Sequence, residues 1–373
     1  MRSVWWIPVF GLVALSGARQ NITAYHRAYG PKNLIRVSQP TVTWEVWPSD
    51  GAKVTGVELS INGVDVKARY DERKRAVFFT PSQPLEPGTY VVKARVIVER
   101  ELVVKRDWQF RIAQNSVADL PGPSAAQNRL IAAINDIRDT LGVPRVTMDD
   151  RLNAAAQSHS AYLKLNRTFG HYEQQGMPGF TGHGPGDRME AFGYFGSSFE
   201  DVATGAPSIE RGLQMLFDAP YHRIPFMFPG EMIAGTGWDG SALTVKFGFT
   251  DGKQVVVSPA PGQRDVPTSW NGNERPNPLR VHGASGTVGY PIMIGAFGPQ
   301  QSLSVESATL TKGGVIVPTY LNSPENDDEL NDVAFLMPKE PLQPLTTYTV
   351  TFAVKSGAGQ RIRRQWSFMT GAR

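Results

Sequence analysis

The sequence predicts a multidomain protein with a central α+β domain flanked by two all-β immunoglobulin-like sandwiches. Three observations lead to this fold class. The chain has 373 residues, apolar residues alternate with a period of two near both ends, and a helical period appears in the middle. Because this length exceeds the usual size of one hydrophobic core, we expect separate domains over residues 35–115, 124–257 and 275–373.

Residues 1–18 are predicted to be a secretory signal peptide. Arg2 precedes an apolar run from Val4 to Leu15, and three small residues follow at 16–18. The run is short for a bilayer span, and no later stretch approaches membrane length. We expect a secreted or cell-envelope-associated protein without a transmembrane helix once the signal is removed. An uncleaved anchor or a buried N-terminal strand is the alternative.

Two segments predict sandwich strands and resemble each other. Tyr90 to Val98 alternates apolar and polar residues, as does Tyr348 to Val354. Residues 81–87 (PSQPLEP) match residues 338–344 (PKEPLQP), and the interval from Tyr90 to Trp108 equals that from Tyr348 to Trp366. This internal repeat favours two immunoglobulin-like domains, with each Trp expected in a sandwich core.

The middle of the chain predicts three amphipathic helices. Ser124 is a suitable N-cap for the first, which ends at Gly142; the second covers 150–165 and the third 208–217. Residues 176–198 are rich in Gly and Pro and predict a long loop, which in a compact domain is often functional. Proline-rich residues 258–278 predict a second linker, after a first one at 115–124.

Composition excludes several classes of function. The net charge of +4 is mild for this length, and no dense Lys/Arg run with aromatic residues occurs, so nucleic acid is not an expected partner. The chain contains no cysteine, which excludes thiol nucleophiles and thiolate metal sites.

Four of the six histidines lie between residues 159 and 222, which marks the central domain as the site of any chemistry. His159 falls on the apolar stripe of the second helix, so we expect it in the core. His183 belongs to the Gly/Pro-rich loop and is expected to line a groove. Arg188 is expected to have a structural role rather than to bind substrate, paired with a carboxylate such as Glu190 or Glu200.

The central region resembles the CAP superfamily of cysteine-rich secretory proteins, antigen 5 and pathogenesis-related proteins, in its cysteine-free bacterial form. The resemblance covers about residues 124–249 and rests on an ordered series of short motifs. They are Leu130 to Gly142, Leu152-Asn153-Ala154-Ala155-Ala156 with His159-Ser160, His171, Glu200, Pro220-Tyr221-His222-Arg223, and Gly235-Thr236-Gly237.

The resemblance implies an α-β-α sandwich with a shallow groove that carries two histidines and two acidic residues. His171 and His222 take the places of the histidines, and Glu200 takes that of the first glutamate. The second acidic position falls on Ala219, so Asp218 is the nearest carboxylate. The groove or ligand-binding candidates are His171, Tyr172, Glu173, His183, Glu200, Asp218, Tyr221 and His222.

Two hypotheses follow for this site. His171, His222 and Glu200 suit a divalent metal such as Zn²⁺, although a metal-free polar groove explains the same residues, so no cofactor is required. In the first hypothesis the groove binds a peptide, glycan or lipid, such as a cell-envelope component, without catalysis. In the second, the same three residues form a metal-dependent hydrolase of peptide or cell-wall substrates. The missing acid at Ala219 favours binding over catalysis.

Overall fold

The computed structural model describes residues 22–49, 51–249, 251–300 and 302–372, so the predicted signal peptide at 1–18 lies outside the described residues. The chain divides into two compact units. The first contains the N-terminal sandwich together with Asp150–Ala155 and His171–Ser197. The second contains Pro123–Asp149, Ala156–Gly170 and the chain that follows Ser198. Within the described residues, no helix is both long and apolar enough to cross a membrane.

The first unit is built on a β-sandwich around a core that includes the fully buried Trp44. One sheet has the order β1 (Ala24–Gly30), β3 (Val42–Pro48), β7 (Ala76–Phe79), β6 (Arg69–Asp71). The other has the order β2 (Asn33–Val37), β9 (Leu102–Val117), β8 (Gly88–Val98), β4 (Val54–Ile61), β5 (Val64–Asp65). The sandwich therefore begins at Ala24, before the predicted start at residue 35.

The central sheet has the order β10 (Thr147–Met148), β12 (Ile233–Asp239), β13 (Ala242–Gly248), β11 (Ser198–Thr204). Helices α1 (Ala125–Leu141), α4 (Ile209–Asp218) and α5 (Pro220–Met227) share a hydrophobic core with one face of this sheet. The opposite face contacts α2 (Asp150–Asn166), where Ser160 Oγ donates a hydrogen bond to Thr244 Oγ1 over 2.9 Å. The α-β-α arrangement expected for a CAP domain is therefore present.

The three predicted helices are confirmed. Ser124 caps α1, and Gly142 ends it with a left-handed φ of 68°. Ser208 is the N-cap of α4, and its Oγ accepts a hydrogen bond from Arg211 N over 3.2 Å. The predicted loop at 176–198 differs from expectation, because it contains the short helix α3 (Pro185–Ala191). Pro185 at the first helical position suits this start, since its missing N–H would have no partner there.

The C-terminal sandwich repeats the strand order of the N-terminal one. Its first sheet runs β14 (Gln254–Ser258), β17 (Ile292–Phe297), β21 (Val333–Pro338), β20 (Thr319–Asn322). Its second sheet runs β19 (Val315–Ile316), β18 (Leu303–Lys312), β22 (Thr347–Ser356), β23 (Arg361–Met369). The first sheets match position by position, and the second sheets match in four strands, since β2 at the edge of the N-terminal sheet has no C-terminal counterpart. The shared order supports the internal repeat. Because β14 pairs with β17, the sandwich begins at Gln254, inside the range expected for the central domain.

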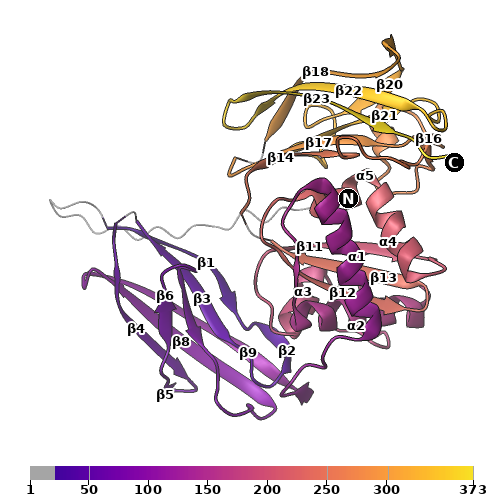
Figure 1. Cartoon of the computed structure of the whole chain (residues 1–373). Coiled ribbons are helices and arrows are strands. Elements are labelled where there is room, and N and C mark those ends of the chain that lie inside the picture. The colour runs from indigo at the N-terminus through magenta and orange to yellow at the C-terminus, as the bar shows by residue number, and fades with distance from the viewer. Residues whose placement is uncertain (1–21, 50, 250, 301, 373) are drawn as a thin grey trace. The chain divides into compact units, whose positions relative to one another are not determined.

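The first sheet of the C-terminal sandwich is buried on both faces. Ile292 and Ile294 of β17 point into the sandwich core, whereas Met293 and Phe297 join the core of the central domain. Phe228 bridges the two, because its ring lies 4.3 Å from that of Phe249 and 5.3 Å from that of Phe297. Figure 1 shows α5 between the central sheet and this part of the sandwich. The central domain and the C-terminal sandwich therefore share one hydrophobic core.

The remaining elements of the second unit lie between β14 and β17 in sequence. They are the short strand pair β15 (Ser269–Trp270) and β16 (Val288–Gly289) and a 3₁₀ helix, η1 (Pro278–His282). Trp270 and Leu279 are buried in the shared core. The predicted linker at 258–278 is thus an ordered segment that packs against the central helices.

Phe228→Ala tests the shared core. We expect it to lower the free energy of unfolding by about 3–5 kcal/mol, because the lost ring leaves a cavity between two modules. Urea unfolding followed by tryptophan fluorescence and circular dichroism measures this. Val315→Ala, at a site that is 69% exposed, is the control and should change stability by less than about 0.5 kcal/mol. Independent unfolding of the two modules, with only one transition shifted, would contradict the shared core.

Candidate functional site

Strand β11 directs two neighbouring carboxylates to opposite faces of the central sheet. In the register with β13, Glu200 lies opposite Lys246 and Asp201 lies opposite Val245. Side chains alternate between faces along a strand, so Glu200 and Lys246 share one face, and Asp201 and Val245 share the other. Thr244, on the Lys246 face, contacts Ser160 of α2. The face of Asp201 is therefore the one covered by α1, α4 and α5.

Glu200 forms a buried ion pair with Lys246, and the two side chains are 1% and 0% exposed. Strand pairing alone places them side by side, since directly opposed residues have neighbouring Cβ atoms. Breaking this pair would leave a charge in a low-dielectric environment, so the pair is a fixed feature of the sheet. Glu200 is thus held by a lysine that the sequence analysis did not single out.

Helix α5 begins in an arrangement that uses a carboxylate from far along the chain. Pro220 occupies its first position, and its N-cap residue, Ala219, has no side-chain acceptor. Glu274 supplies the acceptor instead: its carboxylate receives hydrogen bonds from Tyr221 N over 3.2 Å and from His222 N over 2.9 Å. A negative charge at this position also interacts favourably with the positive end of the helix.

The same carboxylate binds the His222 ring. His222 Nδ1 lies 2.5 Å from Glu274 Oε1, and the Glu274 side chain is fully buried. His222 is on the α5 face of the sheet, because Phe226, one helical turn further along α5, packs against Phe247 of β13 at 5.1 Å. Phe247 alternates with Lys246, so His222 and Glu200 lie on opposite faces of the sheet. The structure does not bring these two predicted partners together.

His222 interacts electrostatically with the carboxyl groups of Asp201 and Glu274, which lie on the same face of the sheet. Burial acts to lower the pKa of His222, but the hydrogen bond to Glu274 and the charges of Asp201 and Glu274 outweigh it and raise the pKa to about 9. Burial raises the pKa of Asp201 to about 8, with His222 opposing and Glu274 adding to the rise. At neutral pH this cluster therefore holds a charged imidazolium beside a largely protonated Asp201.

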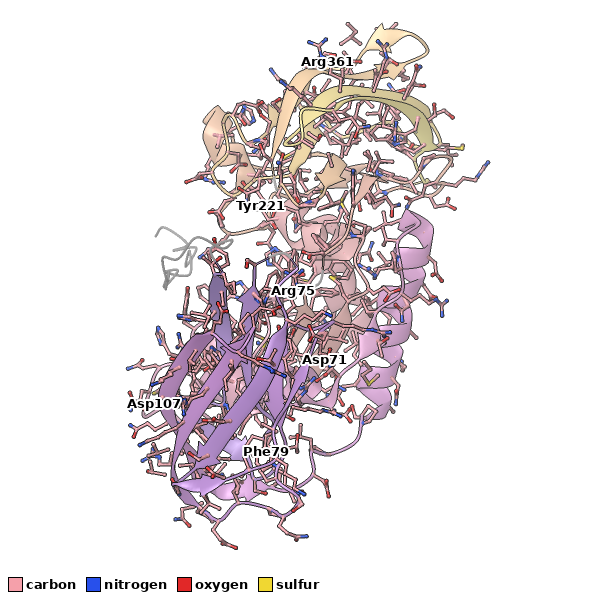
Figure 2. All side chains as sticks on the ribbon, turned by 90° about the vertical axis from the view of Figure 1, so that its left-hand side faces the viewer. Asp71, Arg75, Phe79, Asp107, Tyr221 and Arg361 are labelled. Carbon is pink, nitrogen blue, oxygen red and sulfur yellow. The ribbon has the colours of Figure 1, made fainter. Side chains whose placement is uncertain are left out.

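Tyr221 and Arg223, which flank His222 in sequence, also contact the C-terminal sandwich and the segment that precedes β17. Tyr221 Oη donates to Asp327 Oδ2 over 2.6 Å, and Arg280 bonds both Tyr221 Oη and Asp327. Figure 2 shows Tyr221 where the helical layer meets the sandwich. The fully buried Arg223 donates to the carbonyls of Phe217 over 2.6 Å and Pro291 over 2.8 Å. Tyr221, His222 and Arg223 are therefore all bound to residues later in the chain.

Asp218, the nearest carboxylate to the missing acidic position, lies at the end of α4. Its Oδ1 accepts a hydrogen bond from Tyr290 Oη over 3.1 Å, and its backbone oxygen accepts one from Arg223 Nη2 over 3.0 Å. Burial raises the pKa of Asp218, although Arg223 and the Tyr290 hydrogen bond oppose the rise. Like α5, α4 lies on the sheet face opposite Glu200, so Asp218 is not placed with that glutamate.

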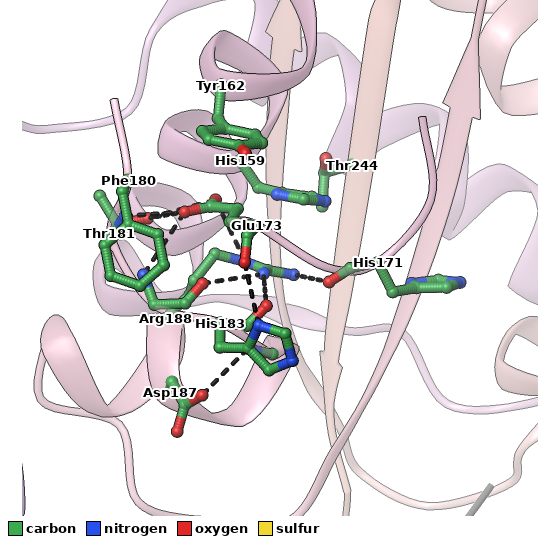
Figure 3. Close-up of polar contacts among 12 residues, drawn as sticks. His159, Tyr162, His171, Glu173, Phe180, Thr181, His183, Asp187, Arg188 and Thr244 are labelled. Atoms are coloured by element: carbon green, nitrogen blue, oxygen red, sulfur yellow. Dashed lines mark hydrogen bonds and ion pairs between the residues drawn. The ribbon is translucent and has the colours of Figure 1, made fainter. Parts of the chain in front are cut away.

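The remaining candidates belong to the loop between α2 and α3, in the first unit. Glu173 is 1% exposed, and its carboxylate accepts a hydrogen bond from Thr181 N over 2.7 Å and lies 3.7 Å from Arg188 Nε. Arg188, fully buried, also donates to the backbone oxygen of His171 over 2.9 Å. Its structural role is as expected, but its carboxylate partner within this unit is Glu173. Figure 3 shows these contacts converging on the Arg188 guanidinium.

The same loop presents an aromatic pair at its surface. His183 Nδ1 lies 3.0 Å from the backbone oxygen of Glu173, and Glu173 N donates to His183 O over 2.9 Å. Tyr172 is 66% exposed, with its ring 5.2 Å from the His183 ring. The predicted core position of His159, by contrast, is confirmed, because it is fully buried with Nε2 3.0 Å from Gly170 O.

No group of three or more His, Asp or Glu side chains in the described part of the chain is arranged to hold a metal ion. The individual partners give the reason for two of the predicted ligands. Glu200 is paired with Lys246 on one face of the sheet and His222 is bound to Glu274 on the other, so the two side chains do not reach one ion. The residues present therefore do not fit a Zn²⁺ site composed of His171, Glu200 and His222.

With this geometry established, the chain is seen to contain a domain of the CAP class. The model of the cysteine-rich secretory protein family (CAP) matches residues 131–226, which include α2, α3, β11 and α4 and most of α1 and α5. The absence of cysteine agrees with the expected cysteine-free form of this domain. A search of curated protein sequences finds no match.

Among solved structures, an extracellular protein containing an SCP domain from Bacillus anthracis is 16% identical, with 64% of this chain and 67% of that chain covered and a TM-score of 0.30. A cysteine-rich secretory protein from Staphylococcus aureus is 9% identical, with 65% and 83% covered and a TM-score of 0.26. An outer surface protein from Borrelia burgdorferi is 21% identical, with 32% and 90% covered and a TM-score of 0.27. Similarities at this level carry no information on ligands or activity.

Glu274→Gln tests the cluster at the start of α5. We expect a loss of about 3 kcal/mol in unfolding free energy at pH 7, because the imidazolium loses its buried counter-charge. In the unmodified chain, the raised pKa of His222 contributes stability that is complete below about pH 6.5 and disappears as pH rises through about 9. The raised pKa of Asp201 has the same sign, since protonation favours the fold.

Urea unfolding at pH 6.0, 7.5 and 9.0 measures both effects. The unmodified chain should lose stability across this range, and Glu274→Gln should show a flatter profile. Glu306→Gln, which removes the exposed partner of Arg361, is the matched control and should cost less than about 1 kcal/mol. Equal stability of Glu274→Gln and this control at pH 7.5 would show that the cluster does not stabilise the fold.

Proposed function

We propose that the protein is an exported, cell-envelope-associated binding protein that acts without catalysis and without a required cofactor. The signal-like composition of residues 1–18 supports export. The ligand classes that we propose are a peptide, a glycan or a lipid, including components of the cell envelope. The observation that carries the proposal is the exposed ring of Tyr172 on a loop whose supporting residues are buried.

The loop beneath Tyr172 supports this role because its conformation is over-determined. Glu173 and Arg188 are buried together, and Arg188 also bonds the carbonyls of His171 and His183. A side chain that is held in place before binding loses little conformational entropy when a ligand arrives. Tyrosine on such a platform offers a large apolar area and one hydroxyl group.

We propose that Tyr172 and His183 form the centre of the binding surface, with His171 beside them in the loop. Their rings contact each other at 5.2 Å, and the imidazole of His183 is oriented by its bond to the Glu173 backbone. An aromatic ring next to an imidazole suits a ligand with both apolar and hydrogen-bonding groups, which peptides, glycans and lipid headgroups share.

The alternative function, a metal-dependent hydrolase that uses His171, Glu200 and His222, meets two physical obstacles. Glu200 and His222 lie on opposite faces of the central sheet, and recruiting Glu200 would also require its separation from Lys246. That separation would leave a buried charge without its partner. The mechanism also needs a metal ion to activate a water molecule, and no group of side chains among the described residues is arranged to hold one.

Tyr172→Ala in the full chain tests the binding proposal. Soluble peptidoglycan fragments, an unstructured peptide library and vesicles of phosphatidylglycerol and phosphatidylcholine are the probes, and binding is measured by fluorescence anisotropy or co-sedimentation. We expect one probe class to bind and its affinity to fall about tenfold in the variant, as for a central aromatic contact. Val64→Ala, 67% exposed on the N-terminal sandwich, should bind like the unmodified chain.

The same preparation distinguishes the hydrolase. Metal analysis after dialysis, for the unmodified chain and for His171→Ala with His222→Ala, should give the same low content of Zn²⁺. Hydrolysis of a peptide, ester or glycan substrate that is lost in Glu200→Gln would support the enzyme. If no probe binds, or if Tyr172→Ala binds as well as Val64→Ala, the proposed binding surface is wrong.

A further inference from the structure

A cavity of about 280 Å³ lies in the second unit between α4 and the segment around β15. One wall consists of residues at positions i, i+4 and i+7 of α4, which share a helix face. The other wall is the turn that follows β15. The lining residues are Arg211, Met215, Asp218, Ser269, Trp270, Asn271 and Asn273. This cavity is formed by the central domain and the C-terminal region together, and it is separate from the Tyr172 surface in residue content.

Asp218 is held at this cavity by buried scaffolding. Tyr290 Oη donates to its carboxylate, and Arg223 donates to its backbone oxygen. Arg223 is itself fully buried and lies 4.5 Å from the centre of the Tyr290 ring. The carboxyl group is therefore presented in a defined position by residues whose own positions are fixed. Groups that are preorganised in this way lose little entropy on binding a ligand.

The opposite wall is also held in one conformation. Asn273 N donates to Asn271 Oδ1 over 3.1 Å, and Asn277 Nδ2 donates to Gly272 O over 3.0 Å. Gly272 has a φ of 70°, and a Cβ there would lie 2.7 Å from Gly286 O, so the turn accepts only glycine at this point. Trp270 is 5% exposed, packed in the core with one part of its surface at the cavity.

The lining has the chemistry of a site for a neutral polyhydroxyl compound. Asp218 supplies acceptors, Arg211 supplies donors, and the two asparagine side chains and Ser269 supply both. One carboxyl and one guanidinium group leave no excess of charge to select an ion. Met215 and Trp270 add a small apolar surface suited to the C–H groups of a ring. A cavity of about 280 Å³ has room for one sugar ring.

We propose that this cavity binds a single sugar unit of a glycan, with Asp218 and Arg211 bonding its hydroxyl groups and the rest of the glycan extending outward past Asn271 and Asn273. Both asparagines line the cavity and are exposed, so a following unit could leave the cavity past them. The inference is independent of the proposed binding at Tyr172, because it uses other residues.

The test uses the full chain and a panel of methyl glycosides of glucose, galactose, mannose and N-acetylglucosamine. Saturation-transfer NMR and isothermal titration calorimetry measure binding. We expect at least one glycoside to bind with a dissociation constant on the order of 1 mM, as suits one ring. Asp218→Asn should weaken that binding at least tenfold, and Arg211→Gln should weaken it several-fold.

Glu210→Gln is the matched control on the same helix, since Glu210 is exposed and does not line the cavity. Glycoside binding that is lost in Tyr172→Ala but retained in folded Asp218→Asn would belong to the proposed Tyr172 surface and would overturn the proposal for the cavity. Asn271→Ala, on the exposed turn, replaces Asp218→Asn if that variant unfolds by circular dichroism, and should also weaken binding. Absence of binding by every glycoside, or undiminished binding in folded Asp218→Asn or Asn271→Ala, overturns the proposal.

Discussion

The packing of the second unit depends on the buried carboxylate of Glu274 at the start of α5. Glu274 accepts hydrogen bonds from two backbone N–H groups at the start of α5 and from the His222 ring, so one buried group completes both a helix end and an ion pair. Without it, the first turn of α5 would expose unpaired donors in a buried setting, because Ala219 cannot cap the helix. The position of α5 in turn sets where Tyr221, Arg223 and Phe228 meet the C-terminal sandwich. Glu274, which lies after the region matched by the CAP family model, thus supplies the carboxylate that Ala219 at the helix N-cap lacks.

The two sandwiches show how one strand order serves two environments. In the N-terminal repeat, β3 alternates buried and half-buried residues, with Val42, Trp44 and Val46 in the core. The corresponding C-terminal strand, β17, is buried along its whole length because its second face packs against the central helices. A strand covered on both faces needs apolar residues at every position. The two sandwiches therefore share a topology, but one face of the C-terminal sandwich is internal. That face joins the sandwich to the CAP domain in a common core.

The sequence predicted the parts of this structure that depend on local patterns. The helices follow from period and capping at Ser124 and Ser208, and the sandwiches follow from alternation and the repeated motifs. The start of the C-terminal sandwich does not follow from such patterns. The prolines at 259–278 indicate a linker, although Trp270 in that segment and Leu279 just after it are buried. The continuous apolar runs at 292–297 and 333–338 were the available signal for a sheet covered on both faces. The partners of His222 and Glu200 depend on contacts between distant segments, and no local spacing identifies Glu274 or Lys246.

The electrostatics at the start of α5 depend on the charge of His222 beside Glu274. The most direct measurement is an NMR titration of the His222 ring in the full chain with ¹⁵N-labelled histidine, assigned by His222→Asn. We expect an imidazolium that persists at pH 7.5 and titrates at about 9. A neutral His222 at pH 7.5, with a pKa at or below the ordinary value of about 6.5, would contradict it.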